Sequence, residues 1–272
     1  MHDMVHHSNR LFMLRRGFAA LAACAICCAT AAEQPSGDTL LIGGGVGVGP
    51  RYAGAKQNAA APVLLLDYSM ANGVFASTLR GLGYGGQAGP LRYSAALGYR
   101  GGRSDKDETS AFGNSGGARL KGMGKIEGNA SAALGVGYAL LPELELGASA
   151  DVPLSHTDNG KNLHLTLTGQ LIARPGDSLS LALAAGFGDS KYGQTYYGVS
   201  AAQAARTPFK AYRAGSGLYE TGATLTWVHT LDARWNVTTM LGVTALVKDA
   251  ADSPLSERKT APSAAVYAAY RY

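Results

Sequence analysis

Apolar and polar residues alternate along most of the chain after residue 38. In the clearest segment, 163–171, leucines and one glycine occupy one face, whereas histidine, threonines and glutamine occupy the other. The same alternation runs through 144–152, 179–187, 235–247 and 264–272. A period of two is typical of β-strands with one apolar and one polar face, so the pattern predicts an all-β protein.

The alternating segments and the turn signals between them predict twelve strands, at 39–49, 61–68, 73–78, 81–86, 91–100, 126–140, 143–154, 161–174, 178–188, 218–231, 234–248 and 262–272. The segment 74–87 is compatible with one strand or with two, which gives a range of about ten to fourteen. Short connections alternate with long polar ones, at 50–60, 101–125, 155–160, 189–217 and 249–261. Bacterial outer-membrane barrels have this asymmetry, with short periplasmic turns and long extracellular loops.

The placement of charged and aromatic residues separates a membrane barrel from a soluble β-sandwich. The apolar face has aromatic residues near strand ends, as in interfacial girdles: Tyr93, Tyr99, Tyr138, Trp227, Trp235 and Tyr270. A dry sandwich core would leave the charges of the other face unpaired at large cost. The last strand ends in Tyr272 and can pair with 39–49, which closes the sheet. We therefore predict a transmembrane, antiparallel, up-and-down β-barrel over 33–272.

The first 32 residues have the features of a cleaved signal peptide. Two arginines precede an uncharged stretch, 17–32, that is too short to span a bilayer and ends in small residues. We expect cleavage after Ala31 or Ala32. The alternative is lipidation at Cys24, which follows a lipobox-like Leu-Ala-Ala. All three cysteines lie in this segment, so the mature chain offers no thiol chemistry.

Composition adds few chemical candidates. The net charge of +5 is not concentrated in any basic run, so no nucleic-acid partner is expected. The glycine-rich run 43–49 lacks the Lys-Ser/Thr of a phosphate-binding loop and is interpreted as strand. His156, His164 and His229 show no metal spacing. We expect no cofactor, no metal and no enzymatic activity, although a hydrolase site assembled across strands is beyond what sequence spacing tests.

Two loop motifs resemble the MipA/OmpV family of outer-membrane proteins, namely 194–199 (Gln-Thr-Tyr-Tyr-Gly-Val) and 249–254 (Asp-Ala-Ala-Asp-Ser-Pro). Supporting stretches lie at 51–54, 80–84, 201–204, 211–215 and 270–272. One name of this family refers to interaction with a murein-degrading lytic transglycosylase. The resemblance therefore implies a scaffold that links a lytic transglycosylase and a peptidoglycan synthase to the outer membrane. A passive solute channel and a surface adhesin remain alternatives.

The motif loops are the candidate functional site, as a constriction or as an interaction surface. The first comprises Tyr192, Gln194, Thr195, Tyr196, Tyr197, Gly198, Val199, Gln203 and Tyr212, and the second comprises Asp249, Asp252, Ser253 and Pro254. Strand counting places the first loop outside the cell, away from periplasmic murein enzymes. We expect its tyrosines to fold it into the lumen, while an enzyme meets the short turns or the lead-in 33–38.

The charges expected in the lumen carry mixed signs. They are Arg92, Arg100, Glu143, Glu145, Asp151 and Lys248. A general pore segregates charge at its constriction, so this mixture favours a scaffold over a channel.

Overall fold

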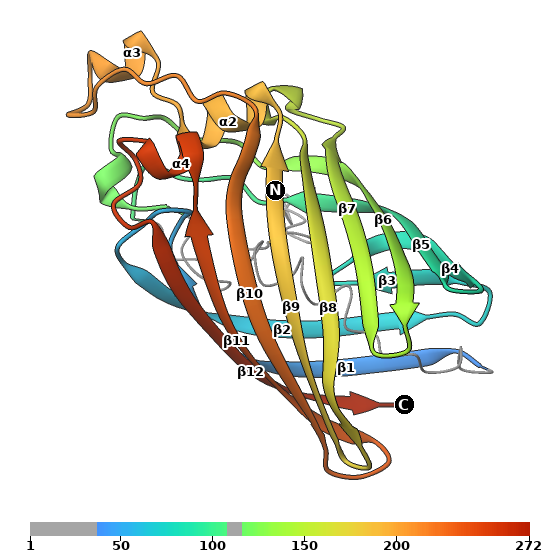
Figure 1. Cartoon of the computed structure of the whole chain (residues 1–272). Helices are drawn as coiled ribbons and strands as arrows, with labels where there is room; N and C mark the ends of the chain where they lie inside the picture. The colour runs from blue at the N-terminus through green and yellow to red at the C-terminus, as the bar shows by residue number, and fades with distance from the viewer. Residues whose placement is uncertain (1–36, 108–115) are drawn as a thin grey trace, which may run out of the picture.

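Twelve strands form one closed antiparallel barrel in the computed structural model, which describes residues 37–107 and 116–272 (Figure 1). Each strand pairs with its neighbours in sequence, and the last pairs with the first. The strands are β1 (Thr39–Pro50), β2 (Asn58–Ser69), β3 (Val74–Ser77), β4 (Gly81–Ala88), β5 (Leu91–Arg100), β6 (Asn129–Leu141), β7 (Leu144–Pro153), β8 (Asn162–Arg174), β9 (Asp177–Gly188), β10 (Gly217–Thr230), β11 (Trp235–Leu246) and β12 (Thr260–Arg271). The predicted fold is confirmed, with strand ends within three residues of those expected. The expected signal peptide lies outside the described residues.

The ambiguous segment 74–87 forms two strands, because the chain turns sharply before β4. Gly81 makes this turn with a φ of +89°, and a Cβ there would lie 2.1 Å from the Leu97 carbonyl oxygen. Only glycine meets both conditions without strain. In β1, Gly45 is required for a steric reason alone, since a Cβ there would lie 2.5 Å from the Cα of Tyr267. The glycine run is therefore a strand in close contact with β12, as expected from its sequence.

The short strand β3 leaves half of β2 without a partner on one side. Only 67–69 of β2 pair with 75–77 of β3. Above them, Leu66 exchanges hydrogen bonds with Thr78, and no strand of the described residues pairs with β2 further along. Pro62 lies in this unpaired half, where its missing N–H costs no ladder bond. We call 58–65 the free edge of β2.

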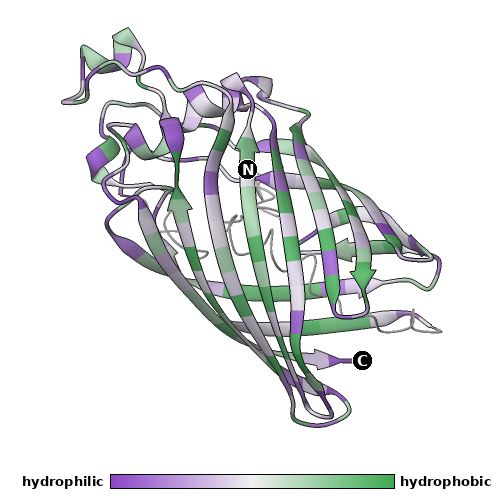
Figure 2. Cartoon of the chain, in the orientation of Figure 1, coloured by the Kyte–Doolittle hydropathy of each residue, from purple (hydrophilic) through white to green (hydrophobic). Residues whose placement is uncertain are grey.

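Apolar and polar residues alternate along the strands (Figure 2), and the large apolar side chains are exposed on the outward face, as the alternation predicted. Large outward side chains are exposed on nearly every strand, including Leu82, Leu97, Leu134, Leu146, Leu165, Leu167, Leu183, Leu241 and Val266. Inward hydroxyl side chains are buried, including Thr166, Thr168, Ser180, Thr224, Thr226 and Thr238. Apart from the free edge of β2, the strands of this closed barrel form their ladder bonds with one another, and such a barrel with an apolar belt suits a bilayer.

The aromatic side chains of the outward face lie mainly at one end of the barrel. Five of the six expected ones, together with Tyr84, stand near the short turns: Tyr93, Tyr138, Trp227, Trp235 and Tyr270. Tyr99 is the exception, because it lies near the other end of β5. The interfacial girdle of this barrel is therefore one-sided.

All long connections emerge at the end opposite the short turns and contain the short helices (Figure 1). These are η1 (Ala118–Leu120), η2 (Thr157–Asn159), α2 (Ser190–Tyr197), α3 (Ala201–Ala204) and α4 (Lys248–Asp252). Among the described residues, no helix is long and apolar enough to cross a membrane. The chain's C-terminal strand ends at the short-turn side, which is the periplasmic side of such barrels.

Candidate functional site

Four long connections pack together into a structure that we call the cap, comprising 51–57, 116–128, 189–216 and 247–259. Each contributes to one buried apolar cluster: Tyr52, Ala55, Leu120, Met123, Val199, Phe209 and Leu255. A cluster of this kind stabilises loops as a small core does, because apolar area from all four is removed from water. The cap is therefore a packed element rather than a set of independent loops.

The two family motifs meet within the cap, which the sequence did not predict. The buried hydroxyl of Ser253 donates to the carbonyl of Tyr197 at 2.6 Å. The hydroxyl of Tyr212 donates to the carbonyl of Asp249 at 2.9 Å, and the amide of Gly215 donates to the Asp249 carboxylate at 2.7 Å. The first motif loop is thus held over the barrel by the second.

The remaining motif residues stabilise the loop locally. Val199 and Tyr212 exchange two backbone hydrogen bonds of 2.8 Å, and the Gln194 side chain accepts from the amide of Ala214 at 3.3 Å. Gln203 forms a capping box with Ser200 at the start of α3 and also donates to the Met123 carbonyl. The others are peripheral or small: Thr195 donates to the Asp158 carbonyl, Asp252 pairs with Lys259, Gly198 follows α2, and Pro254 is half-buried.

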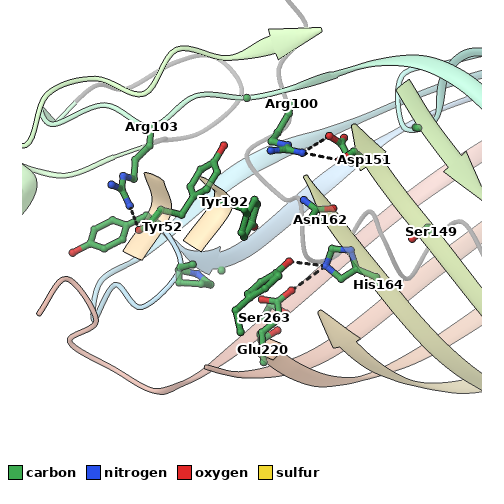
Figure 3. Close-up of a pocket in the computed structure, with 18 of the residues that line it drawn as sticks. Tyr52, Arg100, Arg103, Ser149, Asp151, Asn162, His164, Tyr192, Glu220 and Ser263 are labelled. Carbon is green, nitrogen blue, oxygen red and sulfur yellow. Dashed lines mark hydrogen bonds and ion pairs between the residues drawn. The ribbon is translucent and has the colours of Figure 1, made fainter. Parts of the chain in front are cut away.

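Three motif tyrosines line a cavity of about 340 Å³ directly beneath the cap (Figure 3). Tyr192, Tyr196 and Tyr197 all come from α2, and Tyr197 is only 2% exposed. Asp189 accepts from the Tyr192 amide and caps this helix at its N-terminus. Burial raises the pKa of each of these three phenols, so all stay neutral at physiological pH. Tyr212, by contrast, is not among the cavity residues.

Two sets of polar side chains connect different strands across the cavity. Arg100 pairs with Asp151, whose carboxylate also accepts from Ser131 at 3.0 Å. His164 bonds through its Nε2 atom to the Tyr219 hydroxyl at 2.9 Å and to a Glu220 carboxylate oxygen at 3.2 Å (Figure 3). The sequence had suggested only that His164 faces the lumen.

Arg103 also enters the cavity, from the loop after β5. Its side chain is 8% exposed, and its Nη1 atom donates to the Tyr196 carbonyl at 2.7 Å. Burial lowers its pKa, although nearby tyrosines oppose the shift. The sequence carries no signal for Arg103, because loop residues follow no alternation from which the direction of a side chain can be predicted.

Two of the six charged residues expected in the lumen lie elsewhere. Glu143 is exposed in the turn between β6 and β7, and Lys248 is exposed at the start of α4. The lumen charges are also paired rather than isolated, since Arg92 contacts Glu145 at 2.9 Å. In the lumen near the short turns, the charged side chains therefore neutralise one another.

The described residues hold no metal-ligand cluster, and no serine is hydrogen-bonded to the lumenal His164 among them. No group of three His, Cys, Asp or Glu side chains in this part of the chain could hold a metal ion. Ser149 is the cross-strand partner of His164, yet the hydrogen bonds of His164 go to a phenol and a carboxylate. A serine hydrolase requires a hydroxyl bonded to its histidine.

Several porins and an autotransporter barrel are structurally similar to this chain at low sequence identity. The NanC porin has 8% identity and a TM-score of 0.47, with 85% of this chain and 98% of the porin covered. OprB of Pseudomonas putida has 9% identity and a TM-score of 0.37, covering 87% and 94%. The translocator domain of NalP from Neisseria meningitidis has 12% and 0.39, covering 87% and 89%. Similarity this distant says nothing about a shared ligand or activity.

The sequence comparisons give a more definite result. No curated protein matches the chain. A family profile described as MltA-interacting protein MipA, however, matches residues 42–272, which include all twelve strands except the start of β1. The resemblance drawn from the two loop motifs is thereby confirmed. With its closed barrel and apolar belt, the chain belongs to the MipA family and is an outer-membrane β-barrel protein.

Proposed function

We propose that the protein is a non-enzymatic scaffold that holds murein-remodelling enzymes, a lytic transglycosylase and a peptidoglycan synthase, at the periplasmic end of the barrel. The observation that carries this proposal is the cap, which joins four loops around one buried cluster over the lumen. A general pore needs an open path for solutes. A capped lumen instead leaves the exposed ends of the barrel as the surfaces for interaction.

The periplasmic turns offer a charged surface for such partners. Arg174 and Asp177 flank one turn, and Asp232 and Arg234 lie in another. Arg174, Asp232 and Arg234 are exposed, so a partner can reach their side chains. The description of the family profile supports a transglycosylase as partner. The lead-in 33–38 is the second candidate contact, and Asp38 within it already accepts from the Ala71 amide at 3.1 Å.

The geometry of His164 supports the absence of catalysis. Its ring is held by Tyr219 and Glu220, so no nucleophile is activated by it in the part of the chain described. A passive channel for small solutes is the second candidate function, and the cavity beneath the cap favours it.

Loop deletion separates the scaffold from the channel. We expect the full-length barrel to be electrically silent in planar bilayers, and deletion of 195–214 to produce conductance without loss of transglycosylase binding. The deletion is conservative in geometry, because Gly193 and Gly215 already touch: a Cβ on Gly193 would lie 2.1 Å from the Gly215 carbonyl oxygen. Heat-modifiable migration on gels checks that the variant still forms a barrel.

Charge reversal tests the proposed docking side. Arg174→Glu together with Arg234→Glu should weaken transglycosylase binding in a pull-down, whereas Arg213→Glu in the cap should not. If the loop deletion abolished binding and the turn variant did not, the extracellular cap would be the docking site and the proposal would be wrong.

A further inference from the structure

We propose that the cavity beneath the cap binds a small organic carboxylate, with the guanidinium of Arg103 as its anchor. This inference goes beyond the scaffold role and does not depend on it. The cavity lies at the cap end of the lumen, whereas the proposed enzyme contacts lie at the short turns.

Arg103 has unmet hydrogen-bonding capacity. A guanidinium has five N–H donors, and among the described residues the hydrogen bond of this one goes to the Tyr196 carbonyl. No carboxylate within this part of the chain forms an ion pair with it. A buried cation without a carboxylate is costly, because desolvation is not repaid by an opposite charge. An anion in the adjoining cavity would repay it.

Cationic side chains outnumber carboxylates around the cavity. Six cationic side chains line it, against the carboxylates of Asp151 and Glu220: Arg51, Arg80, Arg100, Arg103, Arg258 and Lys259. Four of the six have carboxylate partners, which are Asp107, Asp67, Asp151 and Asp252. Arg258 resembles Arg103, because its bond goes to the neutral Asn58 and its buried Nε atom has no acceptor. The site is therefore cationic.

The aromatic and apolar walls of the cavity indicate what the body of the ligand is like. Rings of Tyr192, Tyr196 and Tyr197 form one wall, with Phe75 and Leu246 among the other lining residues. Flat phenol rings pack well against an apolar or cyclic body. The buried hydroxyl of Tyr196 lies near the Arg100 guanidinium but has no acceptor of its own among the described residues, so it can donate to a polar group of the ligand. A volume of about 340 Å³ lies at the small end of ligand pockets.

These features together specify a monocarboxylate on a ring-sized apolar body. The planar fork of an arginine matches the two oxygens of a carboxylate. Of the two lining arginines without a carboxylate partner in the described part of the chain, Arg103 is buried and lies next to phenols, whereas Arg258 is only half-buried, so the buried part of the site suits a single negative charge. Benzoate is therefore the probe, benzamide its neutral isostere and phenyl phosphate the alternative anion.

The test uses the full-length protein refolded in detergent, with calorimetric titration and thermal unfolding. Benzoate should bind and raise the unfolding midpoint, while benzamide should do neither. Arg103→Gln should weaken benzoate binding by about 10- to 100-fold, the usual effect of losing a charged hydrogen bond. Arg213→Gln removes an exposed cap arginine that does not line the cavity, and should leave binding unchanged.

A purely structural arginine would behave differently. Without ligand, Arg103→Gln should keep or raise the unfolding midpoint, because glutamine can still donate to the Tyr196 carbonyl and the buried charge is gone. A lowered midpoint with unchanged benzoate binding would overturn the proposal, as would equal binding of benzamide or tighter binding of phenyl phosphate. If Arg103→Gln does not fold, Arg103→Lys retains the charge but not the fork, and should still lose affinity; unchanged affinity would count against the site.

Discussion

Leu167 and Thr166 are neighbours in β8 but face different environments. Leu167 is 37% exposed on the outward face, whereas Thr166 is 5% exposed inside the barrel. Alternation alone predicted this difference correctly. It also follows that the lumen is packed at this level, so a large side chain at Thr166 would be overpacked rather than hydrated.

Depth in the bilayer sets the cost of a charge on the outward face. Leu167→Arg, in the middle of β8, should destabilise the barrel by about 2 to 4 kcal/mol, because the guanidinium would lie in hydrocarbon. Leu231→Arg is the matched control: Leu231 is also exposed, but it lies in a periplasmic turn, where the cost should fall to about 0 to 1 kcal/mol. Equilibrium refolding into lipid vesicles measures both, and equal costs would contradict the membrane placement.

The pairing of lumen residues was less predictable than their direction. Arg100 on β5 meets Asp151 on β7, with β6 between them. Such contacts depend on the register and tilt of three strands, which the period of one strand does not contain. Arg103 was missed altogether, since its direction is set by the cap.

Among the strands, β2 differs because one side of its upper half has no partner. Leu66 directs its N–H and C=O toward β3, and these directions alternate along a strand. The backbone N–H and C=O groups of Ala60 and Leu64 therefore point away from β1, toward the side without a partner strand. Those of Ala61 and Leu65 point toward β1, with which β2 pairs in an unbroken register. The sequence indicated a weak strand at 74–87 but not which neighbour would lose its ladder.

Amide exchange should record this alternation. In detergent, the amides of Ala60 and Leu64 should exchange much faster than those of Ala61 and Leu65, which bond to β1. Residue-resolved NMR provides the measurement, and the corresponding positions of β8, paired on both sides, provide the control. Uniform protection along β2 would show that something else pairs with its edge.

The cap should loosen at high pH because its tyrosines must remain neutral. Burial, followed by the charge of Glu257, raises the pKa of Tyr52 from about 10 to about 12. A raised folded-state pKa stabilises the cap fully below pH 10, and this stability is lost as the pH rises toward 12.

Phenolate absorbance and protease cleavage of the cap should both rise in that window. Tyr52→Phe should reduce the displaced part of the absorbance titration. A phenolate transition completed near pH 10, with the cap intact, would contradict the packing described for Tyr52.

At the scale of the whole molecule, the one-sided aromatic girdle fixes the barrel at one interface. The fold, a strand number of about twelve and five of the girdle residues were predictable, because each follows from local alternation and turn signals, whereas Tyr84 was missed and Tyr99 lies at the other end. The one-sidedness and the assembly of the cap were not, since the loops carry no periodic pattern.

Both tryptophans of the chain should report this anchoring. Trp227 and Trp235 lie on the outward face near periplasmic turns, in contact with His229 and Tyr270. In vesicles of lipids brominated at different depths, each should be quenched most by shallow bromines. The variants Trp227→Phe and Trp235→Phe give the two depths separately. If either tryptophan were quenched most strongly by deep bromines, its position at the membrane interface would be contradicted.

The free edge of β2 matters to the lipids as much as to the protein. Acyl chains cannot accept or donate hydrogen bonds, so the backbone groups at this edge need water or headgroups as partners, apart from the Leu64 carbonyl, which accepts from the Thr78 hydroxyl. The bilayer beside β3 must then be thinner than the bilayer beside the long strands β8 to β10. Because thickness mismatch costs free energy along the perimeter, this barrel should orient its β3 side toward thin patches of membrane and toward other proteins that create them.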